Sequence, residues 1–96
     1  MKIVAIERNI PGVEHEQFTS ELLKEEAAKV WEYYKAGIFR EMYFTQEMHK
    51  AVIILECSTE SDAAAYLQEL PLVKHKLIEF ETYSLINYDG FQRLFI

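Results

Sequence analysis

An arginine and a glutamate, Arg40 and Glu41, stand side by side in a run of aromatic and branched residues from Gly37 to Phe44. The run predicts a β-strand that follows a helix-ending glycine. Neighbouring residues of a strand point to opposite faces of the sheet, so one of these two charges faces whatever covers each face. A charge held against an apolar layer is energetically expensive, which makes this strand a candidate place for chemistry.

Arg40 is the first candidate for a catalytic residue. Its guanidinium group, inside a barrel, can bind a carboxylate or stabilise an enolate oxygen. The alternative is an ion pair with Glu56 or another strand carboxylate across the sheet, and the register of the strands decides between the two interpretations.

Two further catalytic candidates, Glu7 and Glu56, end apolar runs of predicted strands. A carboxylate against a desolvated wall has a raised pKa, which suits a base working near neutral pH. The competing interpretation is a strand-end side chain that reaches water or pairs with Arg8 or Lys50. The acidic surface of the first helix, which includes Glu26, is interpreted as a solvated face.

The histidines and tyrosines provide weaker candidates. His75 begins the last predicted strand and is a candidate acid–base group near a barrel mouth. His49 lies in a predicted turn, and Tyr43 and Tyr83 lie on predicted strands; these three are candidate substrate-binding residues, although such aromatics more often pack in a core. No histidine spacing matches a metal site, so we predict no metal or other cofactor. A heme needs only one proximal histidine, so the spacing speaks less strongly against heme.

Length and composition restrict the function classes. The 96 residues make one domain, 1–96, and 50% of them are hydrophobic, more than a small monomer easily buries. We therefore expect self-association into a homodimer or a higher homo-oligomer. The net charge of −6 and the lack of a basic stripe argue against nucleic acid as a partner. No apolar run has membrane-spanning length and the N-terminus does not resemble a signal peptide, so we expect a cytoplasmic protein without membrane contact.

Hydrophobic periodicity and turn residues predict six elements that position these candidates. Thr59 is the expected cap of the second helix, and Pro71 is expected to end it. The predicted strands are 2–9, 38–46, 50–57 and 75–87, and the predicted helices are 14–36 and 60–70.

The order β-α-β-β-α-β predicts an α+β, ferredoxin-like fold: a four-stranded antiparallel sheet with two helices on one face. The strands are too apolar for the other face to meet water, so we expect a second subunit to cover it and form a dimeric α+β barrel. The tail, residues 88–96, contains several large apolar residues, whereas a free terminus is normally polar. We expect this tail to pack on the partner subunit or across the mouth of a pocket.

Two segments resemble the muconolactone isomerase family. These are Gly37-Ile38-Phe39-Arg40 after the long first helix, and Leu70-Pro71-Leu72 before the last strand. His49 corresponds to a histidine of that family if one gap is allowed. The similarity extends from the first strand to Ile86, and Phe44 stands where the family has a second arginine.

The resemblance implies a dimeric α+β barrel that binds a small-molecule ligand. It also implies a cofactor-free isomerase that moves a proton on a lactone or small organic acid, with Arg40 pointing into the barrel as the partner of an oxyanion. The alternatives are a monooxygenase of the same superfamily and a non-catalytic dimer that binds a ligand or assembles with another protein.

Overall fold

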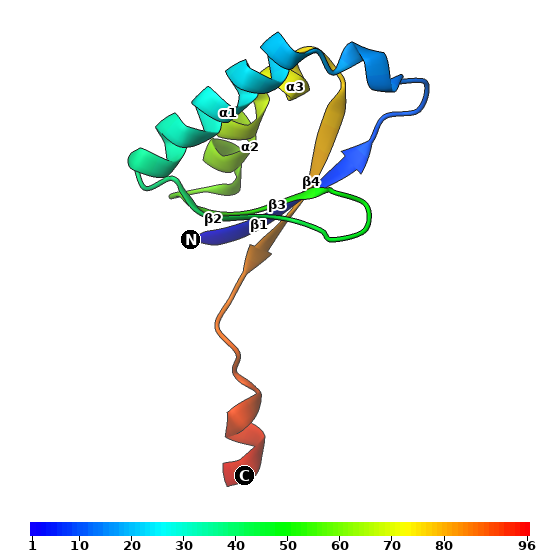
Figure 1. The fold of residues 1–96 in the computed structure, drawn as a ribbon. Helices are drawn as coiled ribbons and strands as arrows, with labels where there is room; N and C mark the ends of the chain where they lie inside the picture. The colour runs from blue at the N-terminus through cyan, green and yellow to red at the C-terminus, as the bar shows by residue number, and fades with distance from the viewer.

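The computed structural model describes all 96 residues and contains one four-stranded antiparallel sheet with its helices on one face (Figure 1). The strands lie in the order β2-β3-β1-β4, which confirms the predicted ferredoxin-like α+β fold. The strands are β1 (Lys2–Asn9), β2 (Phe39–Phe44), β3 (Ala51–Glu56) and β4 (Ile78–Leu85). The helices are α1 (Ser20–Lys35), α2 (Glu60–Gln68) and α3 (Pro71–Lys74), with 3-10 turns η1 (His15–Gln17) and η2 (Gly90–Phe95).

Local capping signals explain most of the helix boundaries. The hydroxyl of Thr59 accepts a hydrogen bond from the backbone N–H of Asp62 at 3.0 Å, as the sequence predicts. Thr19 caps α1 in the same way by accepting from the backbone N–H of Leu22 at 3.2 Å, so the predicted helix from residue 14 is divided into η1 and α1. Gly37, with φ of +78°, ends the helical region in the left-handed conformation.

Pro71 both ends α2 and begins α3, because proline is favoured in the first turn of a helix where its missing N–H is not needed. The expectation that strand structure begins at His75 is therefore wrong. His75 is the C-terminal cap of α3, and β4 begins at Ile78.

A bulge in β2 sets which side chains face which layer. Phe39 pairs with Leu55 and Glu41 pairs with Ile54, so Arg40 is an extra residue in β2. Phe39 is fully buried under the helices, and Glu41 shares the opposite face with Tyr43. The bulge thus keeps Phe39, Met42 and Phe44 all on the helix side of the sheet.

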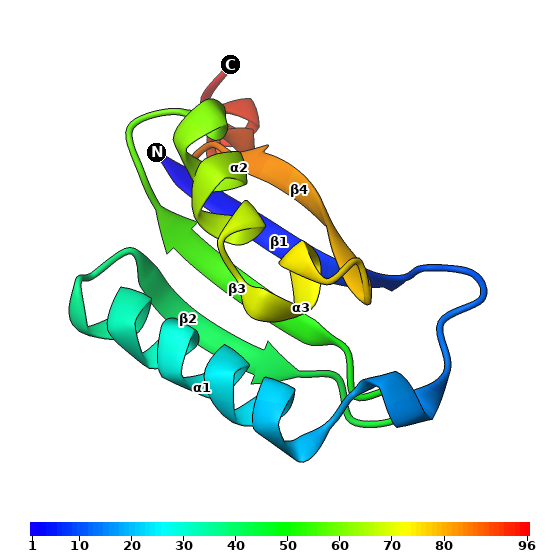
Figure 2. The same cartoon turned by 90° about the horizontal axis from the view of Figure 1, so that it is seen from above.

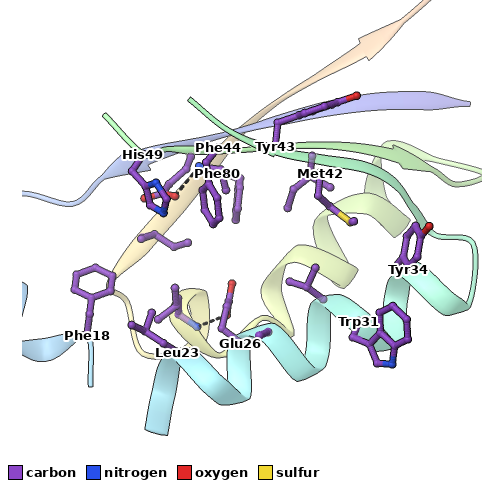
Figure 3. Close-up of a pocket in the computed structure, with 17 residues that line it drawn as sticks. Phe18, Leu23, Glu26, Trp31, Tyr34, Met42, Tyr43, Phe44, His49 and Phe80 are labelled. Carbon is purple, nitrogen blue, oxygen red and sulfur yellow. Dashed lines mark hydrogen bonds between the residues drawn. The ribbon is translucent and has the colours of Figure 1, made fainter. Parts of the chain in front are cut away.

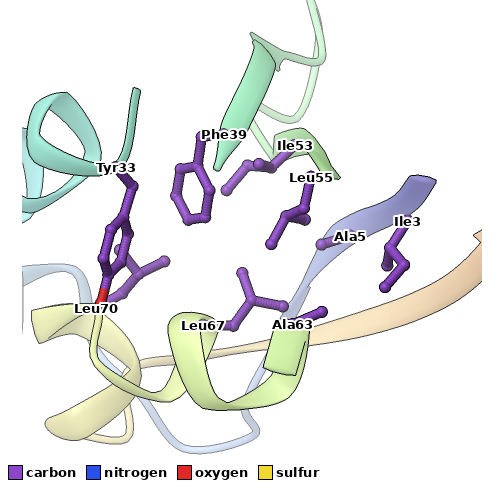
Figure 4. Packing of buried hydrophobic residues seen from close by; sticks show 9 residues of the cluster. All are labelled: Ile3, Ala5, Tyr33, Phe39, Ile53, Leu55, Ala63, Leu67 and Leu70. Atoms are coloured by element: carbon purple, nitrogen blue, oxygen red, sulfur yellow. The ribbon is translucent and has the colours of Figure 1, made fainter. Parts of the chain in front are cut away.

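The main core lies between the sheet and the helices, as Figure 4 shows. Its side chains come from every strand except β4 and from both longer helices and the loop that follows α2. Tyr33 contacts Phe39 with ring centroids 5.1 Å apart, which joins the end of α1 to the bulge. The nine residues of this core are Ile3, Ala5, Tyr33, Phe39, Ile53, Leu55, Ala63, Leu67 and Leu70.

The sheet face opposite the helices is uncovered within the chain; we call it the open face. Val4 lies at its centre, paired with Ile54 on one side and Tyr83 on the other. The C-terminal tail leaves β4 on this side and points away from the helices (Figure 1). No helix of the structure combines the length and the apolar character needed to span a membrane.

Candidate functional site

A cavity of about 760 Å³ lies between α1 and the helix side of the sheet (Figure 3). Figure 2 shows α1 running beside β2 on that side. This volume is in the range of small-molecule sites, which are mostly apolar with a few polar groups. Fourteen of its 17 lining residues are hydrophobic, which matches that pattern. The lining residues are Glu7, Phe18, Leu23, Glu26, Ala27, Val30, Trp31, Tyr34, Met42, Tyr43, Phe44, His49, Ala51, Ile53, Leu72, Ile78 and Phe80.

Two carboxylates stand on different walls of this cavity. Glu7 comes from β1, and its Oε1 accepts a hydrogen bond from the backbone N–H of Ala51 at 2.9 Å. Glu26 comes from α1, and its Oε1 accepts from the backbone N–H of Leu72 at 2.9 Å. Each carboxylate is thus oriented by a backbone donor through one oxygen, which leaves its second oxygen available to a ligand.

The pKa of Glu26 is raised above its ordinary value of 4.5, first because the half-buried carboxyl group is desolvated. The negative charge of Glu7 raises it further, whereas the hydrogen bond from Leu72 opposes the rise. A carboxyl group with a raised pKa can exchange a proton closer to neutral pH than an exposed one. The interpretation of Glu26 as part of a solvated face is therefore wrong.

His49 is the third polar group of the lining. Its ring stacks on Phe44 with centroids 4.0 Å apart and an angle of 15° between the planes. Its backbone has φ of +53°, in the left-handed region, because it follows the turn that returns the chain from β2 to β3. The stack places an imidazole at the end of the cavity that is nearest to the turn (Figure 3).

The structure brings three of the seven predicted site residues to this cavity: Glu7, His49 and Tyr43. Tyr43 takes part only at the wall, because its ring points to the other side of the sheet in Figure 3. Its hydroxyl donates a hydrogen bond to Oε1 of Glu41 at 2.6 Å on the open face. The roles predicted for these residues in catalysis or binding stay predictions.

The other four predicted site residues lie outside the cavity. Arg40 is exposed, and its Nε donates a hydrogen bond to the backbone oxygen of Gly37 at 2.6 Å. His75 is exposed beyond α3. Tyr83 is 48% exposed on the open face, where a hydrogen bond with Glu81 raises its pKa.

The pKa of Glu56 is shifted in the direction opposite to the predicted one. Its Oε2 accepts a hydrogen bond from the N-terminal ammonium group of Met1 at 2.7 Å, and this interaction holds its pKa below the ordinary value. The predicted rise in the pKa of Glu56 is wrong because β3 ends beside the start of β1, where a positive charge is available.

The spacing between Glu26 and its apolar neighbours on α1 could have identified it as an inward-facing residue. Glu26 lies four residues after Leu22 and four before Val30, both of which face inward on α1. Residues four apart share one face of a helix, so Glu26 belongs to the apolar stripe and not to the solvated side. No three side chains of histidine, cysteine, aspartate or glutamate lie close enough together to hold a metal ion.

Replacing Glu26 with glutamine is expected to change how stability depends on pH. A raised pKa in the folded state means that Glu26 favours folding below pH 4.5 and that this contribution is lost as the pH rises through the folded pKa. Urea unfolding should therefore show Glu26→Gln gaining stability relative to the wild type as the pH rises. Glu25→Gln, on the exposed side of α1, is the matched control for the same substitution outside the cavity lining. A Glu26→Gln difference that does not change with pH would contradict the raised pKa.

Comparisons with known proteins support the fold described above. No protein-family model matches the sequence, and no curated protein matches it. Muconolactone isomerase has a similar structure, with a TM-score of 0.76 and 13% sequence identity, over 94% of this chain and 93% of the isomerase chain. A second similar structure is 5-chloro-2-hydroxyhydroquinone dehydrochlorinase from Burkholderia phenoliruptrix AC1100, in complex with 2,5-dihydroxybenzoquinone. Its TM-score is 0.66 and its identity 13%, over 94% of this chain and 98% of the dehydrochlorinase.

At this level of identity the likeness establishes the fold and leaves the activity open. The alignments cover nearly the whole chain, so the likeness belongs to the complete βαββαβ unit and not to one motif. The chain therefore has the same α+β, ferredoxin-like fold as muconolactone isomerase, as the sequence resemblance predicts.

Proposed function

We propose that this protein binds a small ring-shaped organic acid or lactone in the cavity under α1 and moves a proton on it without a cofactor. The observation that carries the proposal is the pair of carboxylates, Glu7 and Glu26, on two walls of an otherwise mostly apolar cavity. An apolar lining accommodates a hydrocarbon ring, and carboxyl groups can take and return protons.

The two carboxylates can divide the chemistry between them. Moving a double bond requires a base that removes a proton from the carbon beside it. The electron pair then shifts toward the carbonyl oxygen, and a proton is returned at another carbon. Glu26 is the candidate for the group that exchanges this proton, because burial raises its pKa. Glu7, on the opposite wall, is the candidate for the second carboxyl group that contacts the ligand.

The similar structures support the size of the proposed ligand. One of them is an isomerase named for a lactone, and the other was solved with a small quinone bound. Both names describe small ring compounds, and a cavity of about 760 Å³ has room for a compound of that kind.

We also propose that the protein acts as a homodimer joined through the open face. The pairing of β1 with β3 places four apolar side chains at the centre of this face: Val4, Ile6, Val52 and Ile54. Arg8 forms ion pairs with Glu79 at 3.3 Å and Glu81 at 3.5 Å, which offset part of the acidic charge along β4. A second copy of the same face would remove this apolar strip from water.

Exchange of carbon-bound hydrogen gives a direct test of proton transfer. We expect a lactone such as muconolactone to exchange protons with D2O faster in the presence of the protein, as followed by NMR. Glu26→Gln and Glu7→Gln should each slow this exchange by about 10²–10⁴-fold, the usual contribution of a general acid–base group. Glu25→Gln, adjacent in sequence but outside the cavity lining, should leave the rate unchanged.

Binding is measured separately with the single tryptophan, because Trp31 lines the cavity. A ligand that changes Trp31 fluorescence and shows no catalysed exchange would identify a non-catalytic binding protein and contradict the enzymatic proposal. Arg40→Ala, Glu56→Gln and His75→Ala belong in the same assay, which tests the catalytic roles predicted for these residues. Full exchange in both Glu7→Gln and Glu26→Gln would remove the cavity carboxylates from the mechanism.

A further inference from the structure

The C-terminal tail and the two residues before it, together Ile86–Ile96, expose an unusual amount of apolar surface. Their six large apolar side chains are between 67% and 103% exposed within the chain: Ile86, Tyr88, Phe91, Leu94, Phe95 and Ile96. The molecule measures 56 × 28 × 22 Å, and the tail extends along its long dimension (Figure 1). An isolated subunit therefore leaves in water a segment that its composition favours burying.

The tail has local order of its own. The rings of Tyr88 and Phe91 meet edge to face with centroids 5.0 Å apart. Gly90 is buried beneath Tyr88, and a Cβ atom at this position would collide with the Tyr88 ring. These contacts order the start of η2. The remaining apolar side chains of the tail pack on nothing within the chain.

The tail points away from the cavity of its own subunit and therefore does not cover that cavity. Figure 1 shows the helices on one side of the sheet and the tail on the other, whereas the cavity lies on the helix side. In a dimer joined through the open faces, the partner's sheet stacks about 10 Å away, and the partner's cavity lies beyond that sheet. The tail extends in this same direction.

The length of the tail matches that path. The four residues before η2 form no regular helix or strand and the six residues of η2 form a 3-10 turn, which together span at most roughly 25 Å. A segment of this length passes the edge of the partner's sheet and reaches the partner's helix layer.

The cavity lining and Arg93 of the tail carry opposite charges. The cavity lining contains two carboxylates, Glu7 and Glu26, and no lysine or arginine. Arg93 is the single basic residue of the tail; it is exposed and forms no ion pair within the chain. Its neighbours Leu94 and Phe95 suit the apolar mouth formed by exposed side chains such as Leu23 and Trp31.

We infer that the tail of each subunit closes the cavity of the partner subunit and brings Arg93 to the mouth of that cavity. The partner's Arg93 would then provide the positive charge that an anionic ligand requires in a site otherwise lined by carboxylates and apolar groups. This inference rests on the proposed function for the identity of the site, and it adds an anionic ligand class and a contribution from a second chain.

Disulfide trapping tests the position of the tail without any ligand. In a Cys57→Ala background, chains that carry Leu23→Cys are mixed with chains that carry Phe91→Cys, Leu94→Cys or Phe95→Cys and are oxidised mildly. We expect at least one tail position to form a mixed disulfide between the two chains, which mass spectrometry identifies. A disulfide needs Cα atoms within about 7 Å, so Lys24→Cys, one residue along α1 and outside the cavity lining, should not react with the same partners.

Ligand charge tests the role of Arg93. Benzoate and benzamide have the same shape and differ in charge, and calorimetry measures the affinity of each. We expect Arg93→Gln to weaken benzoate binding about tenfold, as for loss of one charge-assisted hydrogen bond, and to change benzamide binding little. Arg93→Lys should keep most of the benzoate affinity.

The two experiments separate failure of this inference from failure of the proposed function. No mixed disulfide at any tail position, or equal trapping at Lys24→Cys, overturns the placement of the tail even if lactone exchange is catalysed. Benzoate binding that is unaffected by Arg93→Gln overturns the role of Arg93. Trapping without binding of any ring compound would retain the tail in the partner and contradict the proposed function.

Discussion

Ile54→Asp is expected to convert the proposed homodimer into a folded monomer. Ile54 lies near the centre of the open face, between Val4 and Glu41. In a two-fold dimer each substitution appears twice, so two carboxylates would be buried in an apolar interface. Burying such unpaired charges costs several kcal/mol, which corresponds to a dissociation constant raised about a thousandfold or more. Sedimentation velocity over a range of concentrations measures the change.

The fold of the subunit should survive this substitution. Ile54 points away from the helices and is not part of either buried core cluster, so circular dichroism should show unchanged secondary structure. Lys24→Asp, which places the same new side chain on the exposed surface of α1, is the control and should leave the mass unchanged. If Ile54→Asp sediments as the wild type does, the open face is not the dimer interface, and the path inferred for the tail loses its basis.

Local signals made the fold predictable from the sequence. Gly37 ends the helical region and Thr59 caps α2 through interactions with near neighbours in the chain, so residue type alone indicates them. The apolar runs of β1 and β3 identify central strands because both faces of those strands contact apolar layers in the predicted dimer. Together with the turn residues between them, these signals determine the element order and hence the ferredoxin-like topology.

The candidate site was less predictable because it depends on contacts between distant segments. Glu26 meets the backbone N–H of Leu72 across 46 positions of sequence, and no local pattern reports such a contact. The bulge at Arg40 is also a property of the β2–β3 pairing and not of the run of residues that contains it. A regular strand would place Arg40 and Glu41 on opposite faces, and the bulge leaves Arg40 at its backbone contact with Gly37.

The same bulge explains why Phe39→Ala is expected to be among the most destabilising substitutions in the chain. Phe39 is 0% exposed and packs against Tyr33 and the nearby core. Removing a fully buried phenylalanine side chain costs about 3–5 kcal/mol, a large part of the roughly 5–15 kcal/mol that stabilises a typical domain. Equilibrium urea unfolding should show this loss as a lower midpoint with an unchanged slope.

Phe44→Ala separates the core from the cavity on the same strand. Phe44 also faces the helix side but is 62% exposed, because it lines the cavity and stacks on His49 instead of filling the core. We expect its removal to cost well under half of the loss at Phe39 and to alter ligand binding. Equal destabilisation at the two positions would mean that the space under α1 is part of the packed core. A large difference would mean that the two ends of β2 have different roles. The Phe39 end packs against α1 in the core, and the Phe44 end lines a cavity that is open to a ligand.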